Sequence, residues 1–171
     1  LDENQRKAIV WDVERGAPNE IMERPWQSCS CIGGWHYTTS VYENNWYKSA
    51  SDVAKLLIDI VSKNGNLLLS VPLRADGTFD EKEEKILNEF GNWMNINKEA
   101  IYQTRPWKIF GEGPIADKDV QLNAQGFNEW AYSKADAKEI RFTQTDKNLY
   151  ATVLGWPEDG KILIRSLAEG N

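Results

Sequence analysis

Hydrophobic and polar positions follow recognisable periods along the first 100 residues. Residues 8–13 form a short apolar run that ends at the charged pair Glu14 and Arg15, as a buried strand does. Residues 66–71 form a second apolar run, whose continuous leucines are typical of a strand buried on both faces, as in a parallel sheet. Residues 17–48 are polar, aromatic and aperiodic, so we expect a long loop there.

Two amphipathic helices are predicted on either side of the second apolar run. The first begins with a capping-box pattern at residues 49–52 and ends in a cationic turn before Gly65. The second begins at Asp80, with Glu83 three positions later as its capping partner. Their apolar faces comprise Val53, Leu56, Leu57, Ile60 and Val61 in the first helix, and Ile86, Leu87, Phe90, Trp93 and Met94 in the second.

The pattern changes after residue 110. A polar linker opens at residues 111–114, and the segments 138–145, 149–155 and 161–167 then alternate with a period of two. Turn residues at 145–148 and 157–160 separate these segments, so we expect three strands of an antiparallel meander. The sequence therefore predicts two domains, residues 1–110 and residues 111–171, the second of them all-β and incomplete.

Strand, loop and helix repeated twice is the order of an α/β fold. Residues 1–110 fit the C-terminal part of a (β/α)8-like barrel, with polar side chains at the ends of its strands. A fragment of a doubly wound sheet is the alternative. No glycine-rich phosphate loop follows either strand, which weakens the nucleotide-binding form of that alternative.

Charge and cysteine content exclude several classes of partner. The net charge of −6 comes without a basic cluster, which argues against nucleic acids and anionic membranes. No apolar run reaches the roughly 18 residues of a membrane span. Cys29, Cys31 and His36 lack the second ligand pair of a structural zinc site, so we expect no metal and two buried thiols. The chain begins at Leu1 without Met or a signal segment, and both ends read as cut from a larger protein.

Tryptophan provides the strongest functional signal. The chain has eight, and four polar segments (residues 23–27, 33–37, 44–47 and 105–107) each hold one of them. An indole in a loop leaves a large apolar area in water unless its face is used. Indoles beside Asn, His, Glu and Arg suit a ligand with apolar C–H faces and polar edges, as sugars have. The alternative for any single Trp is packing beneath a loop.

Several motifs, in order along the chain, resemble glycoside hydrolase family 29, the α-L-fucosidases. They are residues 34–37 (Gly-Trp-His-Tyr), 64–69 (Asn-Gly-Asn-Leu-Leu-Leu), 76–78 (Asp-Gly-Thr) and 93–102. The resemblance covers roughly residues 8–110 and, more loosely, the β meander. It implies the C-terminal part of a (β/α)8-like catalytic domain followed by the start of a β-sandwich. One departure is that residues 67–72 read Leu-Leu-Leu-Ser-Val-Pro where the family commonly has Leu-Leu-Leu-Asn-Val-Gly-Pro.

The resemblance implies a retaining glycosidase that removes terminal α-L-fucosyl groups without a cofactor. Such an enzyme needs two carboxylates about 5 Å apart, a nucleophile and an acid/base. The family's nucleophile is an Asp upstream of Leu1, so the missing N-terminal part is a required partner. The acid/base candidates are, in order of preference, Glu14, Glu20 and Glu23. Glu14 comes first because the end of a strand holds a carboxylate rigidly.

Three further residues are expected to bind the sugar. Arg15 matches the family's arginine that reaches into the sugar site, although a structural ion pair with Glu14 or Asp12 is the alternative. Trp35 matches the aromatic platform for the fucose ring, and His36 is a weaker candidate for a sugar contact. We interpret Trp93 and Trp107 as core residues.

Two other functions stay open at this stage: a non-catalytic carbohydrate-binding protein and an inactive member of the family. Buried parallel strands favour the enzyme, because binding modules of this size are usually β-sandwiches throughout. The expected partner is a fucosylated oligosaccharide or glycoconjugate. The family resemblance places the protein in a secreted, periplasmic or lysosomal compartment.

Overall fold

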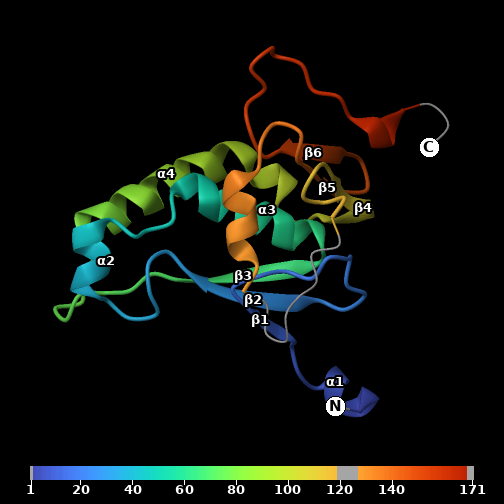
Figure 1. Cartoon of the computed structure of the whole chain (residues 1–171). Coiled ribbons are helices and arrows are strands. Elements are labelled where there is room, and N and C mark those ends of the chain that lie inside the picture. Colours follow the sequence, from blue (N-terminus) through green and yellow to red (C-terminus); the bar gives the residue numbers. More distant parts are fainter. Residues whose placement is uncertain (1, 119–126, 169–171) are drawn as a thin grey trace.

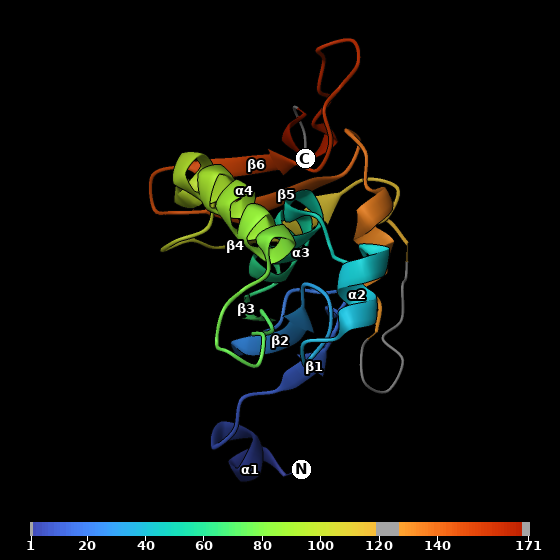
Figure 2. The same cartoon turned by 90° about the vertical axis from the view of Figure 1, so that its left-hand side faces the viewer.

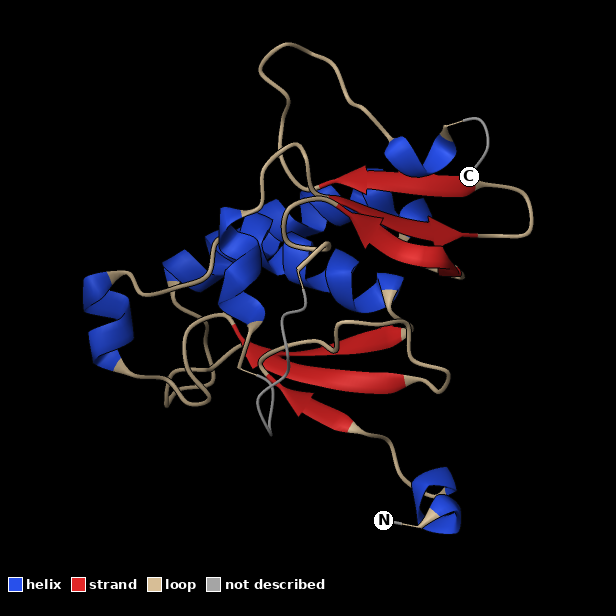
Figure 3. Ribbon diagram, turned by 45° about the vertical axis from the view of Figure 1, so that its right-hand side comes forward, coloured by secondary structure: helices blue, strands red, loops and turns tan. Residues whose placement is uncertain are grey.

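The structure is a computed structural model that describes residues 2–118 and 127–168. It has three layers: a three-stranded parallel sheet, a layer of helices, and a three-stranded antiparallel sheet (Figures 1, 2 and 3). The coarse class is therefore α/β followed by antiparallel β, as predicted. The central helix α3 (Ala50–Ser62) lies between the two sheets and contacts both.

The parallel sheet consists of β1 (Asp12–Glu14), β2 (Trp26–Cys31) and β3 (Gly65–Ser70), in that order. Strand β1 confirms the first predicted strand only in part, because it begins at Asp12 and residues 9–11 before it are exposed, although the Trp11 carbonyl accepts from the Gln27 N–H at 2.9 Å. Strand β2 corrects the prediction of a continuous loop over residues 17–48. A short helix, α2 (Thr39–Asn44), also lies within that range.

Strand β2 escaped prediction because two of the three alternate residues that it buries toward α3 are serines. Trp26, Ser28 and Ser30 face the helix layer, and both serines are fully buried. The Ser28 hydroxyl donates to the Gly16 carbonyl at 2.7 Å, and the Ser30 hydroxyl donates to the Glu129 carboxylate. These hydrogen bonds satisfy the buried hydroxyls, so the strand needs no apolar period.

Strand β3 has one buried face rather than the two that its leucines predict. Leu67 packs toward α3 in a core with Val13, Trp26, Leu56 and Ile60, whereas Leu68, on the opposite face, is 56% exposed. The strand register places Leu68 beside Cys29, and Cys29 beside Glu14. The described chain therefore leaves one face of the parallel sheet without a covering layer.

The two predicted helices are present with their capping boxes. Ser49 caps α3 with Asp52 as its partner, and Asp80 caps α4 (Glu81–Asn97) with Glu83. The chain leaves α3 through Asn64 in the left-handed conformation (φ 70°), so this turn does not depend on Gly65. Short helices complete the inventory: α1 (Glu3–Lys7), η1 (Lys98–Ala100), η2 (Glu129–Lys134) and η3 (Arg165–Leu167).

The antiparallel sheet has the order β4 (Arg105–Glu112), β5 (Ile140–Gln144) and β6 (Leu149–Val153). The predicted strands at residues 138–145 and 149–155 are confirmed. Strand β4 was not predicted; it is an edge strand, the position in a sheet where a proline such as Pro106 is tolerated. It also crosses the domain boundary drawn between residues 110 and 111, which stays a prediction.

The third strand predicted, over residues 161–167, is wrong. Residues 161–164 are irregular, and 165–167 form the short helix η3. The Glu112 carboxylate accepts hydrogen bonds from the backbone N–H groups of Arg165 (2.8 Å) and Ser166 (2.9 Å). These contacts hold the segment against the end of β4 as a turn, and the apolar residues Ile162 and Leu163 face solvent.

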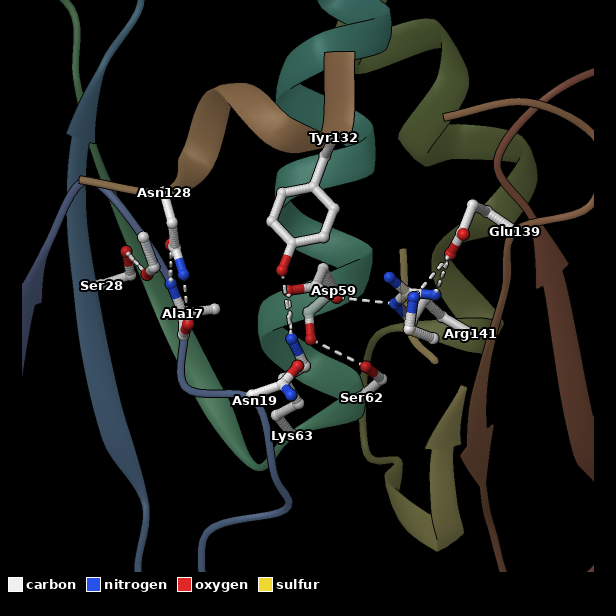
Figure 4. Close-up of polar contacts among 12 residues, drawn as sticks. Ala17, Asn19, Ser28, Asp59, Ser62, Lys63, Asn128, Tyr132, Glu139 and Arg141 are labelled. Atoms are coloured by element: carbon white, nitrogen blue, oxygen red, sulfur yellow. Dashed lines mark hydrogen bonds and ion pairs between the residues drawn. The ribbon is translucent and has the colours of Figure 1, made fainter. Parts of the chain in front are cut away.

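A network of buried charges joins α3 to the antiparallel sheet and to η2 (Figure 4). Asp59 is fully buried on α3 and accepts from Lys63 at 2.8 Å and from Arg141 of β5 at 2.6 Å. Lys63 also donates to the Tyr132 hydroxyl at 3.2 Å, and Arg141 also pairs with Glu139 at 2.9 Å. The sheet-to-helix contact on this side is therefore electrostatic as well as apolar.

Both cations influence the ionisation of Asp59. Burial alone raises the pKa of a carboxylic acid, but Lys63 and Arg141 outweigh burial here and hold the pKa of Asp59 below its ordinary value. Burial of the Lys63 ammonium lowers its pKa. The network thus keeps an ionised carboxylate in the centre of the molecule.

Within the described ranges 2–118 and 127–168, no helix is both long and apolar enough to cross a membrane.

Candidate active site

The carboxyl ends of the three parallel strands meet at one edge of the sheet, which we call the carboxyl edge. Glu14 ends β1 there, Cys31 ends β2 and Ser70 ends β3. The half-buried Glu14 lies on the opposite face of the sheet from Val13, which is buried against α3. The sequence prediction that β1 delivers a charged group at its end therefore agrees with the structure.

Arg15 follows Glu14 in a left-handed backbone conformation (φ 52°), which is uncommon for a residue with a side chain. Its N–H donates to the Cys29 carbonyl at 2.8 Å, so β1 and β2 remain tied together beyond the last strand pair. The Arg15 side chain is 40% exposed, and its Nε donates to the Glu129 carboxylate at 2.7 Å. Neither predicted structural partner, Glu14 or Asp12, forms an ion pair with it.

Glu129 is the residue of the candidate site that sequence reasoning missed. Its side chain is only 2% exposed, and it accepts from Arg15, Ser30 and Lys48, the last at 2.9 Å. Lys48 also donates to the Cys31 carbonyl at 2.7 Å, at the end of β2. No local pattern marks Glu129, because it lies in a short 3-10 helix 114 residues after Arg15.

The segment that carries Glu129 also fixes the backbone of the candidate residues. Phe127 N–H donates to the Glu14 carbonyl at 2.9 Å, and Glu129 N–H donates to the Arg15 carbonyl at 3.0 Å. Between them, the Asn128 side chain exchanges two hydrogen bonds of 3.0 Å with the backbone of Ala17 (Figure 4). Residues 127–129 thus run along β1 and hold Glu14 and Arg15 in place.

The electrostatics favour an ionised Arg15–Glu129 pair. Burial acts to raise the pKa of Glu129, but the Ser30 hydrogen bond and the charges of Lys48 and Arg15 outweigh it and lower that pKa. The hydrogen bond to Glu129 raises the pKa of Arg15. Because Nε carries this contact, the two terminal nitrogens of the guanidinium have no protein partner among the described residues.

Glu20 and Glu23 lie away from this edge. Both are exposed, in the loop that runs from the end of β1 back to the start of β2. That loop is bonded to the residues that lead into β3: Met22 N–H donates to the Lys63 carbonyl at 3.2 Å, and Asn64 donates to the Met22 carbonyl at 2.9 Å. The loop therefore reaches the amino edge of the sheet, and the structure does not bring the three candidate carboxylates together.

Trp35 and His36 lie in the loop that follows β2, on the side of the carboxyl edge. Trp35 is 42% exposed, so part of its indole is open to a ligand. His36 is exposed, and its backbone carbonyl accepts from the Thr38 hydroxyl at 3.2 Å. The interpretation of two other tryptophans as packing residues agrees with their contacts: Trp93 stacks on Phe90, and Trp107 meets Phe142 edge to face.

The two cysteines are free thiols on one face of β2. Burial and the hydrogen bond to Asp12 raise the pKa of Cys29 to about 11, and burial raises the pKa of Cys31. Both are therefore protonated at neutral pH and are poor nucleophiles or metal ligands. In the part of the chain that the structure describes, no three His, Cys, Asp or Glu side chains are grouped to hold a metal.

Comparisons with known proteins agree on one family. The sequence model described as "Alpha-L-fucosidase" matches residues 2–99. The α-L-fucosidase of Dictyostelium discoideum is 31% identical over 90% of this chain, and human plasma α-L-fucosidase is 28% identical over 88%. The α-L-fucosynthase of Thermotoga maritima, solved in complex with α-L-Fuc-(1-2)-β-L-Fuc-N3, superposes with a TM-score of 0.63 at 25% identity, over 85% of this chain and 29% of that one.

The chain spans about 28% of the length of each of the two curated relatives. The family match covers more than half of the chain and includes the carboxyl edge with Glu14, Arg15, Trp35 and His36. This chain belongs to the α-L-fucosidase family.

Proposed function

We propose that the chain forms the C-terminal part of the catalytic domain, and the start of a following β domain, of a retaining exo-α-L-fucosidase. The observation that carries the proposal is a strand-end carboxylate, Glu14, followed directly by Arg15 at the carboxyl edge of a parallel sheet. In (β/α)8 enzymes this edge carries the catalytic groups. The uncovered face of the sheet, with Cys29 and Leu68, would then face the remaining strands of a (β/α)8-like barrel.

Glu14 serves as acid/base in this proposal. In the first step its protonated carboxyl gives a proton to the glycosidic oxygen as the nucleophile, an Asp upstream of this chain, forms the fucosyl-enzyme bond. In the second step the Glu14 carboxylate takes a proton from water, which attacks the sugar and releases the nucleophile. Backbone contacts from residues 127–129 limit the motion of Glu14, which favours this role over exposed Glu20 and Glu23.

Arg15 supplies hydrogen-bond donors to sugar oxygens through its terminal nitrogens, and its charge favours the ionised nucleophile. Glu129 positions the guanidinium through its contact with Nε, which leaves the terminal nitrogens for the sugar. Glu129 is itself buried and held by Ser30 and Lys48. His36 is proposed as a further sugar contact from the loop after β2.

Trp35 is proposed as the stacking platform for the fucose ring. We expect Trp35→Ala in the complete protein to lower kcat/KM on an aryl α-L-fucoside by about 5- to 150-fold, the equivalent of roughly 1–3 kcal/mol of lost contact. Steady-state kinetics measure the change, and a matched Trp107→Phe variant, altered in the core, serves as control. Unchanged kinetics with a lower melting temperature would instead make Trp35 a packing residue.

The proposed activity is tested on the complete protein. We expect the chain joined to its N-terminal portion to hydrolyse an aryl α-L-fucoside with retention of configuration, followed by NMR of the first-formed sugar. Residues 1–171 alone should show no turnover, since the nucleophile lies elsewhere. Robust turnover by residues 1–171 alone would contradict the placement of the nucleophile upstream of this chain. Sugar binding without turnover by the complete protein would favour the carbohydrate-binding or inactive alternative.

The proposed substrate is a terminal α-L-fucosyl group on an oligosaccharide or glycoconjugate. The human relative is named a plasma enzyme. Together with the family resemblance, that name supports a secreted, periplasmic or lysosomal location for this protein.

A further inference from the structure

The Asp-Gly-Thr motif has no part in the roles proposed above. It lies in the loop from the end of β3 to α4, on the side of the carboxyl edge. Residues 74–80 of this loop, which we call the support turn, close on themselves. Arg74 N–H donates to the Thr78 carbonyl at 2.8 Å, and Gly77, in the left-handed conformation (φ 84°), donates to the Arg74 carbonyl at 2.9 Å. The Asp76 carboxylate accepts from the Thr78 N–H at 3.0 Å and from the Thr78 hydroxyl at 2.7 Å. The motif thus fixes the backbone of Arg74.

The Arg74 side chain reaches from the support turn to the segment around α2, which lies beside this loop (Figure 1). The centre of its guanidinium lies 5.9 Å from the ring centroid of Tyr37 and 6.0 Å from that of Tyr42. A hydrogen bond with Tyr37 is the largest of the effects that raise the pKa of Arg74. The first residue of α4, Glu81, accepts from Arg74 at 3.2 Å and from the Tyr42 hydroxyl. Arg74 therefore holds Tyr37, the residue directly after His36, against the support turn.

Asp80, the last residue of the support turn, acts on the other end of the same segment. Its carboxylate is fully buried and binds two elements. Oδ1 accepts from two backbone N–H groups in the first turn of α4, at 2.8 and 2.9 Å, whereas Oδ2 accepts from the Tyr47 hydroxyl at 2.6 Å. The Tyr47 ring lies directly against Gly33, since a Cβ placed on Gly33 would lie 3.0 Å from two ring atoms. Asp80 therefore fixes Tyr47, and Tyr47 limits the motion of the backbone two residues before Trp35.

We propose that the support turn positions the sugar contacts of the fucosidase site, with Arg74 and Asp80 as its positioning residues. It holds residues 33–37, which we call the platform segment, at both ends: through Asp80 at the first residue and through Arg74 at the last. Trp35 and His36 lie exposed between these two points. Fixing both ends limits the orientations of the segment before a ligand arrives, so less freedom is lost on binding. The inference rests on the proposed function, because the placement of Trp35 and His36 affects activity only if they contact the sugar.

The first test removes the support at Tyr37. In the complete protein, Arg74→Ala should lower kcat/KM on an aryl α-L-fucoside about two- to tenfold, the range that corresponds to one lost hydrogen bond. Arg74→Lys keeps a charge for Glu81 and should recover part of the loss. Lys85→Ala is the matched control, because this cation of α4 pairs with Glu89 on the same helix at 3.9 Å, and its kcat/KM should equal that of the parent protein.

A double-mutant cycle distinguishes positioning from general stabilisation. In a background that carries Trp35→Ala and His36→Ala together, Arg74→Ala should change kcat/KM by less than about twofold, because no sugar contact remains for it to position. An equal loss in the parent protein and in this background would overturn the inference and make Arg74 a structural residue only. No loss in the parent protein would overturn it as well.

Hydrogen exchange of the backbone amides tests the support independently of activity. Tyr47→Phe removes the hydroxyl that binds Asp80 but keeps the ring against Gly33, so it alters this contact with little change in packing. We expect both Tyr47→Phe and Arg74→Ala to accelerate exchange in the platform segment about two- to tenfold, while exchange in α3 stays as in the parent protein. Unchanged exchange in the platform segment would overturn the inference. Failure of the parent protein to hydrolyse the aryl fucoside would instead overturn the proposed function.

Discussion

Glu14→Ala in the complete protein is expected to slow hydrolysis of natural fucosides by about 10²–10⁴-fold, the usual contribution of a general acid/base. The first chemical step should stay fast on aryl fucosides with good leaving groups, because these leave without a proton. The second step should become limiting, since no carboxylate remains to activate water. Pre-steady-state kinetics on an activated aryl fucoside would then show a burst of product.

Azide gives the decisive readout for the same variant. A small anion can enter the space left by the carboxylate and attack the fucosyl-enzyme without base assistance. We expect azide to accelerate turnover of the activated substrate by Glu14→Ala and to yield fucosyl azide, which mass spectrometry detects. Glu20→Ala and Glu23→Ala are the controls, because both residues are exposed in the loop that reaches the amino edge. Azide rescue in either control would make that residue the acid/base and Glu14 a structural group.

Asp59→Ala is expected to have the largest effect on stability. The substitution leaves Lys63 and Arg141 buried, each about 1% exposed, without their shared carboxylate. Removing one partner of a buried ion pair costs about 3–5 kcal/mol, because the remaining charge loses its counterion. Arg141 keeps Glu139 at 2.9 Å, so the charge left without an ion-pair partner is that of Lys63. Denaturant unfolding of the complete protein, followed by fluorescence of its tryptophans, should show the transition that includes this region move to lower denaturant.

The design of this experiment separates charge from packing. Asp146→Ala, in the exposed turn between β5 and β6, is the matched control and should change stability by less than about 0.5 kcal/mol. Replacing Asp59, Lys63, Arg141 and Glu139 together by apolar residues of similar volume should recover much of the loss, since none of the four charges then stays buried without its partner. A change below about 1 kcal/mol for Asp59→Ala would contradict the proposed importance of the network.

The stability of the protein should depend on pH through Asp59. Because the folded protein holds the pKa of Asp59 below its ordinary value, this residue contributes stability at pH values above the unfolded pKa of about 4. That contribution is lost as the pH falls through the lower, folded pKa. The stability difference between the parent protein and Asp59→Asn should therefore shrink below about pH 4.

The sequence predicted those parts of the fold that rest on local patterns. Helices α3 and α4, with capping boxes at Ser49 and Asp80, and strands β5 and β6 have short-range signals, and all four are present. Strand β2 lacked such a signal because Ser28 and Ser30 occupy two of its inward positions, and only distant partners satisfy their hydroxyls. The segment 161–167 has the period of a strand, but the Glu112 carboxylate accepts from its backbone N–H groups and stabilises a turn instead.

The residues of the candidate site likewise include some that local patterns predicted and one that they did not. Glu14 was predicted because it ends an apolar run, and Arg15 and Trp35 because they match residues of the family. Glu129 could not be predicted, since its role depends on a contact with a residue 114 positions earlier. An acidic residue in a polar stretch resembles any solvated surface residue until the fold buries it.

The position of residues 127–134 limits where this protein can be cut into separate modules. They lie beyond the range of the family match, which ends at residue 99, yet they supply Glu129 and the backbone contacts of β1. A module cut at residue 110 would therefore lose Glu129, the anchor of Arg15. Chimaeras that exchange the β domain between family members should keep residues 127–134 with the parallel sheet, because a module that ends at residue 110 does not contain the whole candidate site.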